Sequence, residues 1–178
     1  MRFSLFRPNS KPYLERVNVR PLVKKDLKAL EWDGEFTHFR RLYADSYEKV
    51  LAGESQMWVA DLPGTGIIGQ VFIQLICGRP ELANGCTHAY LFSFRVQPAF
   101  RNLGLGSLIL ETVENDLRKR GYTTLTLNVA KDNPRARKLY ERHGFKVTGQ
   151  EPGVWSYLDH EGKWRHVNEP AWRMEKTL

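Results

Sequence analysis

The segment VQPAFRNLGLGS, residues 96–107, decides the fold of this chain. A strand-like apolar run, residues 89–96, precedes it. The residues that follow are apolar at every fourth position, as on one face of a helix: Leu105, Ile109, Val113 and Leu117. A strand, a glycine turn and a helix in this order leave backbone N–H groups unpaired, and the helix dipole adds partial positive charge there. Such a turn can bind a phosphate or a pyrophosphate.

Several kinds of glycine turn compete for this segment. A P-loop requires Gly-Lys-Ser/Thr at the helix start, whereas this chain has Gly106-Ser107-Leu108. The dinucleotide fingerprint Gly-x-Gly-x-x-Gly fails because Ile109 occupies the third glycine position. On these residues alone, an ordinary strand-to-helix turn that binds no phosphate is an equally valid interpretation. The spacing present is Arg101-x-x-Gly104-x-Gly106, preceded by Val96-x-Pro98.

This spacing resembles the pyrophosphate-binding motif of the GNAT superfamily of acyl-CoA-dependent N-acyltransferases. A second block, LNV at residues 127–129 and NPRARKLYERHGF at residues 133–145, is similar to the family's second conserved block. The resemblance runs from about residue 17 to residue 176. It implies an α/β fold with a twisted, mixed central sheet. That sheet is splayed between its fourth and fifth strands to hold acetyl-CoA, with helices on both faces.

The resemblance also implies how the chain binds coenzyme A. The pyrophosphate would be held by the N–H groups of residues 101–107 and the pantetheine amides by the strand edge at residues 94–96. A backbone N–H of that strand would stabilise the oxyanion. The residues expected at the cofactor are Phe94, Arg95, Val96, Arg101, Asn102, Leu103, Gly104, Leu105, Gly106, Ser107, Asn128, Asn133, Ala136 and Tyr140.

Tyr140 matches the family's general-acid position and is the expected catalytic residue. A phenol with a reference pKa of about 10 can protonate a departing thiolate when held within hydrogen-bond reach. From helical spacing alone, Tyr140 is equally compatible with a core position. Asn128 is also compatible with a plain strand-end amide, and Asn133 with a helix N-cap.

The sequence indicates the general base and the acceptor pocket less clearly than the cofactor site. Residues 87–96 contain no carboxylate, although many family members carry one on this strand. Alternatives for the base are Glu81, His88, Tyr90, Asp33 and Glu35. The resemblance places the acceptor at Trp32, Asp33, Glu35, Phe36 and Tyr157, where a packed lid or a dimer contact is the other interpretation. No metal site is expected.

The remaining segments alternate between strand and helix patterns. We expect a leader at residues 1–15 and a single domain at residues 16–178. Helices are predicted at residues 23–30, 36–53, 105–120 and 134–143, with a break between the first two at residues 32–34. Strands are predicted at residues 17–21, 56–62, 67–77, 88–96, 123–129, 145–148, 155–158 and 171–174.

Composition limits the class of protein. The 178 residues carry a formal net charge of +7, so nucleic-acid binding has to be considered. The basic residues are dispersed, however, and coenzyme A is itself a polyanion, so we do not expect a nucleic-acid partner. No apolar run is long enough to span a membrane and the N-terminal apolar stretch is too short for a signal peptide, which favours a cytoplasmic protein.

The sequence therefore predicts an N-acetyltransferase that moves an acetyl group from acetyl-CoA to a primary amine by direct attack. The amine can belong to a small molecule, a peptide or a protein, and a homodimer is an open possibility. The missing strand carboxylate motivates the alternative, a non-catalytic module that binds or senses acyl-CoA.

Overall fold

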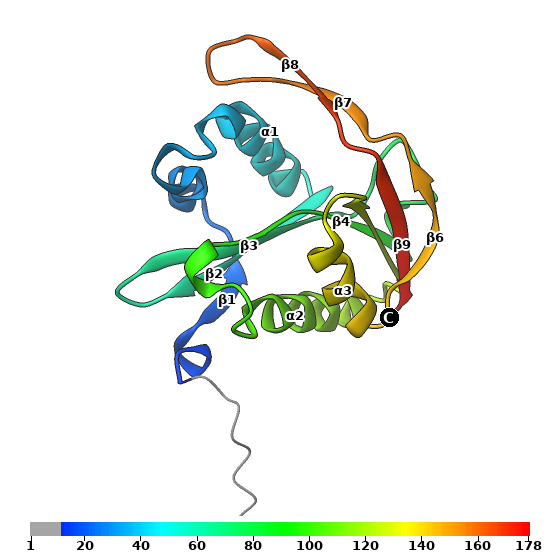
Figure 1. Ribbon diagram of the computed structural model, residues 1–178, viewed down its shortest axis with the longest axis horizontal. Helices are drawn as coiled ribbons and strands as arrows, with labels where there is room; N and C mark the ends of the chain where they lie inside the picture. The colour runs from blue at the N-terminus through cyan, green and yellow to red at the C-terminus, as the bar shows by residue number, and fades with distance from the viewer. Residues whose placement is uncertain (1–11) are drawn as a thin grey trace, which may run out of the picture.

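The computed structural model describes residues 12–178 as a seven-stranded sheet with helices on both faces (Figure 1). The strand order is β1-β2-β3-β4-β5-β9-β6, with β4 and β5 parallel and the other neighbours antiparallel. The mixed sheet and the fold class expected from the sequence are confirmed. The strands of this sheet are β1 (Asn18–Pro21), β2 (Ser55–Leu62), β3 (Gly66–Gln74), β4 (His88–Val96), β5 (Thr124–Ala130), β6 (Lys146–Glu151) and β9 (Ala171–Thr177).

Two hydrophobic cores lie on opposite faces of the sheet. Helix α2 (Leu105–Lys119) covers one face. The side chains of its predicted apolar stripe are each at most 1% exposed. Helix α3 (Pro134–Arg142) lies on this side as well (Figure 1). Helix α1 (Arg40–Leu51) covers the other face, where Tyr43 packs beside Phe72. None of the helices in residues 12–178 combines the length and apolar character that crossing a membrane requires.

The sheet parts between β4 and β5. These strands pair only from His88–Thr124 to Leu91–Leu127, although β4 continues to Val96. A register shift against β3 occurs in the same stretch, where Ser93 has a positive φ of 51°. The edge of β4 beyond Leu91 is therefore free on its β5 side. The predicted splay between the fourth and fifth strands is confirmed.

The segment before α1 differs from the prediction. The expected helix at residues 23–30 is the 3-10 helix η2 (Lys24–Gly34), and a second short one, η3 (Thr37–Phe39), precedes α1. Left-handed backbone at Trp32 and Asp33 confirms the predicted break. Glu31 accepts hydrogen bonds from Thr37 and Arg40, which fold the chain back at this point. These bonds join residues that are 6 and 9 positions apart, and the periodicity of a helix does not predict them.

The C-terminal region contains a strand that the sequence pattern did not reveal. Strands β7 (Val154–Leu158) and β8 (Trp164–Asn168) form a separate hairpin, which reaches over α1 in Figure 1. The buried carboxylate of Asp159 holds the turn that joins these two strands. It accepts hydrogen bonds from the backbone N–H groups of Lys163 and Glu161 and from the Arg165 side chain. These bonds lower the pKa of Asp159 to about 2.

Residues 1–11 of the leader expected at residues 1–15 lie outside the described residues. Its last part packs against the domain. The Tyr13 ring lies 5.7 Å from the Phe100 ring, and Leu14 belongs to the short 3-10 helix η1 (Leu14–Arg16) beside the α2 core. Tyr13 and Leu14 thus contact the glycine turn.

Gly153, between β6 and β7, provides a test of this architecture. Its φ is 66°, and an added Cβ would overlap the backbone carbonyl of Glu169. We expect Gly153→Ala to lower the free energy of unfolding by about 1–3 kcal/mol, because the backbone must shift. Gly149→Ala is the control, since Gly149 has open space around it, and should change stability by less than about 0.5 kcal/mol. Urea unfolding measures both, and equal effects would contradict the packing described.

Candidate active site

The glycine turn presents the amino end of α2 to solvent. Gly104 is the N-cap, with φ 88°, and Asn102 also has left-handed backbone. No side chain in residues 12–178 caps this helix end. The first N–H groups of α2, at residues 105–107, are therefore free for an anion, which the dipole of a 15-residue helix also favours.

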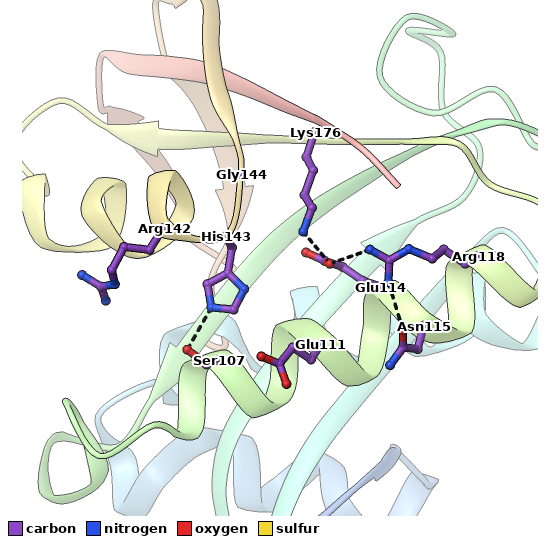
Figure 2. Close-up of a pocket in the computed structure, with 9 residues that line it drawn as sticks. All are labelled: Ser107, Glu111, Glu114, Asn115, Arg118, Arg142, His143, Gly144 and Lys176. Carbon is purple, nitrogen blue, oxygen red and sulfur yellow. Dashed lines mark hydrogen bonds and ion pairs between the residues drawn. The ribbon is translucent and has the colours of Figure 1, made fainter. Parts of the chain in front are cut away.

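Groups from distant segments hold this turn in place. The Tyr13 hydroxyl donates a hydrogen bond to the Leu103 carbonyl at 3.0 Å. Arg135 Nε of α3 donates to Asn102 Oδ1 at 3.2 Å. At the other end of α3, His143 Nε2 lies 2.8 Å from Ser107 Oγ (Figure 2). The turn is thus fixed on both sides, so its N–H groups are preorganised.

Gly106 lets α2 begin close to its neighbours. An added Cβ would lie 3.2 Å from Leu139 Cδ2 on α3 and 3.7 Å from Phe94 Cζ on β4. A larger residue at this position would push α2 away from both elements. Gly106 therefore sets the distance between the glycine turn and the split in the sheet.

The split itself is lined by polar and aromatic groups. Asn128 lies on β5 one residue beyond the last pair with β4, and its buried Oδ1 has no hydrogen-bond partner among the described residues. A buried amide oxygen without a partner is costly, which points to a missing donor at this place. Asn133 caps α3 by accepting a hydrogen bond from Ala136 N at 3.1 Å, as the N-cap interpretation expected.

Tyr140 of α3 lies beside the split and belongs to the α2 core. Its ring is 6.3 Å from that of Phe94 and 5.8 Å from that of Phe145. Burial raises the pKa of Tyr140 well above its ordinary value of 10.0. The phenol therefore stays protonated at neutral pH and is available as a proton donor.

A cleft of about 760 Å³ opens on the α1 side of the split. Its walls come from α1, β4, the end of β5, and the β6–β7 and β8–β9 connections. Asn128 lines it too, so the cleft meets the split at this residue. The charged side chains of the wall are Lys49, Arg79, Arg95, Glu151 and Glu169, and the aromatic ones are Phe39, Tyr43, Tyr90, Phe92 and Trp155.

The residues predicted for the acceptor lie behind this cleft. Phe36 stacks under the Arg95 guanidinium, and Trp32 packs edge-on against Phe36. Tyr157 packs against Phe39, with 4.9 Å between the rings. Asp33 and Glu35 are exposed on the loop. Phe39 and Trp155, next to the predicted positions, are the aromatic residues that reach the cleft from these segments.

The predicted alternatives for the base are dispersed. Tyr90 lines the cleft, and burial raises its pKa to about 12. Glu81 forms an exposed ion pair with Arg79, and His88 contacts Asn84 and Thr87. Sequence reasoning missed Glu151 and Glu169, the two carboxylates in the cleft, because they come from separate strand ends with no common pattern.

A second pocket, of about 770 Å³, lies between α2 and the end of α3 (Figure 2). Its central residue is Glu114, which is 3% exposed and accepts hydrogen bonds from Lys176 at 2.7 Å and Arg118 at 3.2 Å. The Glu114 carboxylate is thus already paired with two cations. Within the part of the chain that the structure describes, no cluster of His, Cys, Asp and Glu could hold a metal ion.

Comparison with known proteins agrees with this geometry. The model of the acetyltransferase (GNAT) family matches residues 24–145, more than half of the chain. This chain belongs to the GNAT family of acetyltransferases. The match includes the glycine turn, α2, β5 and α3, so it covers both blocks on which the resemblance was based.

A curated GNAT relative is the ribosomal protein bS18-alanine N-acetyltransferase of Escherichia coli strain K12. It is 44% identical over 57 residues, which are 32% of this chain and 38% of the relative. The match thus spans well under half the length of that protein.

Solved structures share the fold over nearly the whole chain. Ard1 from Thermoplasma volcanium has a TM-score of 0.69 with 18% identity, over 92% of this chain and 98% of that one. Arabidopsis thaliana NAA60, solved in complex with acetyl-CoA, has a TM-score of 0.66 with 19% identity, over 91% and 98% of the two chains. Likeness at these identities establishes the GNAT fold.

Proposed function

We propose that this chain is an N-acetyltransferase that transfers the acetyl group of acetyl-CoA to a primary amine by direct attack. The observation that carries the proposal is the split between β4 and β5. An uncapped helix end lies on one side of it and a polar cleft on the other, with Tyr140 beside it. The name of the E. coli relative, an alanine N-acetyltransferase for a ribosomal protein, supports both the reaction and a cytoplasmic place of action.

The residues present fit coenzyme A. The N–H groups of residues 102–107 would hold the pyrophosphate, beside Asn133 and Ala136 at the start of α3, whereas the Arg101 N–H is bonded to the Pro98 carbonyl. The free β4 edge at residues 94–96 would pair with the pantetheine arm. The unpartnered Oδ1 of Asn128 would accept a hydrogen bond from an amide N–H of that arm. When bound, acetyl-CoA supplies the thioester carbonyl and the thiolate leaving group.

The chain's own groups can carry the transfer. The acceptor amine would reach the split from the cleft, so that its nitrogen attacks the carbonyl carbon. A free N–H of the β4 edge can stabilise the charge that develops on the carbonyl oxygen. As the C–S bond breaks, the Tyr140 hydroxyl can give its proton to the sulfur, and the proton that the acceptor nitrogen loses restores the phenol through solvent in the cleft. Glu151 is a poor base, since its hydrogen bonds from Arg79 and Arg173 lower its pKa.

The second candidate is a non-catalytic module that binds acyl-CoA. The absence of a carboxylate from β4 between His88 and Val96 favours it. Glu151 and Glu169, which reach the cleft from other segments, speak for the enzyme instead.

Gly106→Trp tests the cofactor site. The indole would displace the start of α2 from Leu139 and Phe94, so we expect acetyl-CoA affinity to fall at least about 100-fold in calorimetric titration. Gly78→Trp, in an exposed loop with open space around the glycine, is the control and should bind like the wild type. Tight binding to Gly106→Trp would rule out the glycine turn as the pyrophosphate site.

Tyr140→Phe tests the role of Tyr140 as the general acid. We expect kcat to fall about 10²–10⁴-fold, with acetyl-CoA affinity nearly unchanged, because the phenyl ring keeps the packing and loses the proton. Tyr122→Phe, at another buried tyrosine of the same core that does not line the cleft, should leave kcat unchanged. Steady-state kinetics from pH 6 to 10 provide the measurement. Unchanged turnover of Tyr140→Phe at every pH would remove the acid role.

A further inference from the structure

Arg95 has an unusual place in the cleft. It lies on the free stretch of β4, next to Phe94, but its side chain points to the opposite face of the sheet. Nη1 donates hydrogen bonds to Tyr43 Oη at 2.9 Å and to Ser93 Oγ at 3.0 Å. These two bonds use both hydrogens of Nη1, so this side of the guanidinium is fixed to the cleft floor.

Two aromatic rings also contact the guanidinium. Its carbon lies 4.5 Å from the centre of the Phe36 ring and 5.0 Å from that of Phe39. Burial lowers the pKa of Arg95, but a guanidinium keeps its charge in proteins. The cleft therefore contains a rigid, partly buried positive charge.

This charge forms no ion pair within residues 12–178. Other arginines of the fold do: Arg20 pairs with Asp26, Arg165 with Asp159, and Arg173 with Glu151. The charges of Glu169 and Glu35 act on Arg95 only from outside ion-pair distance. Nε and Nη2 of Arg95 have no hydrogen-bond partner among residues 12–178 and are not fully buried, so they are available to an anion that enters the cleft.

The free edge of Arg95 has the geometry for a carboxylate. With Nη1 occupied, Nε and Nη2 remain, and these two donors lie side by side and match the two oxygens of a carboxylate. The cleft wall carries the cations Lys49, Arg79 and Arg95 against the carboxylates Glu151 and Glu169. Arg79 and Glu151 pair with each other, and Arg173 also holds Glu151. The wall thus keeps a net positive charge, which favours a ligand that carries negative charge.

We propose that the acceptor is an amine that also carries a carboxylate, as an amino acid does, and that Arg95 binds this carboxylate through Nε and Nη2. The inference rests on the proposed acetyl transfer and adds the substrate class. Bidentate binding at Arg95 would orient the acceptor, because the same strand borders the split where its nitrogen must arrive. An uncharged analogue would leave the partly buried guanidinium unpaired.

Matched acceptor pairs test the proposal directly. The twenty amino acids, β-alanine and 4-aminobutanoate are compared with their primary carboxamides, using acetyl-CoA and the full chain. We expect kcat/KM for the best carboxylate acceptor to exceed that of its carboxamide by roughly 100-fold or more. A preference of less than about threefold across the panel would overturn the proposal.

Variants of Arg95 assign the preference to this side chain. Arg95→Gln should reduce the carboxylate preference to within about threefold, and Arg95→Lys should retain part of it, because lysine keeps the charge without the bidentate edge. Arg41→Gln, at an exposed arginine of α1, is the matched control and should keep the preference. A carboxylate preference that persists in Arg95→Gln would overturn the role of Arg95.

Calorimetry separates this proposal from the proposed function. The complex with coenzyme A is titrated with the best-binding amino acid and with its carboxamide. Stronger binding of the acid that Arg95→Gln abolishes supports the carboxylate site even if no acetyl transfer occurs, and in that case the enzyme assignment fails alone. Equal binding of acid and carboxamide, with acetyl transfer intact, overturns the carboxylate site alone.

Discussion

The parting of β4 from β5 is the constraint on which the rest of this structure depends. Parallel pairing stops at Leu91 and Leu127, so the remaining β4 edge has no ladder partner in the described chain. Backbone donors and acceptors near a protein core normally find partners, and an open stretch of this length is retained where something else completes it. The uncapped α2 end and the unpartnered Asn128 Oδ1 border the same opening. Three incomplete hydrogen-bonding surfaces thus meet at one place.

The surroundings of this opening are held by contacts between distant segments. Tyr13 and α3 fix the glycine turn from two sides, while η3 and the β7–β8 hairpin bring aromatic rings to the cleft. Gly153 allows the β6–β7 and β8–β9 connections to touch. The active-site region therefore depends on tertiary packing more than on any one motif, which explains why the GNAT fold keeps its shape at identities near 20%.

Local patterns made much of the fold predictable. The α2 stripe, the Asn133-Pro134 start of α3 and the limits of β4 follow from periodicity and capping, which act between near neighbours. Periodicity and capping did not predict that η2 is a 3-10 helix or that β8 is a strand. They also did not predict that Glu151 and Glu169 line the cleft. These features depend on contacts that no local period describes, such as those of Glu31 with Thr37 and Arg40. Arg95 was expected at the cofactor from its place on β4, but the bulge at Ser93 sends its side chain to the acceptor face.

That bulge has a consequence for how such a chain can diversify. Because Phe94 and Arg95 are consecutive on an extended strand, one faces the cofactor side and the other faces the acceptor side. The strand edge offered to coenzyme A is backbone, which a change of side chain at position 95 does not alter. If Arg95 selects the acceptor as proposed, a single codon at this position would change the acceptor and leave the backbone edge of β4 as it is. In such a chain, acceptor choice and donor binding would be separable traits, since one depends on a side chain and the other on the main chain.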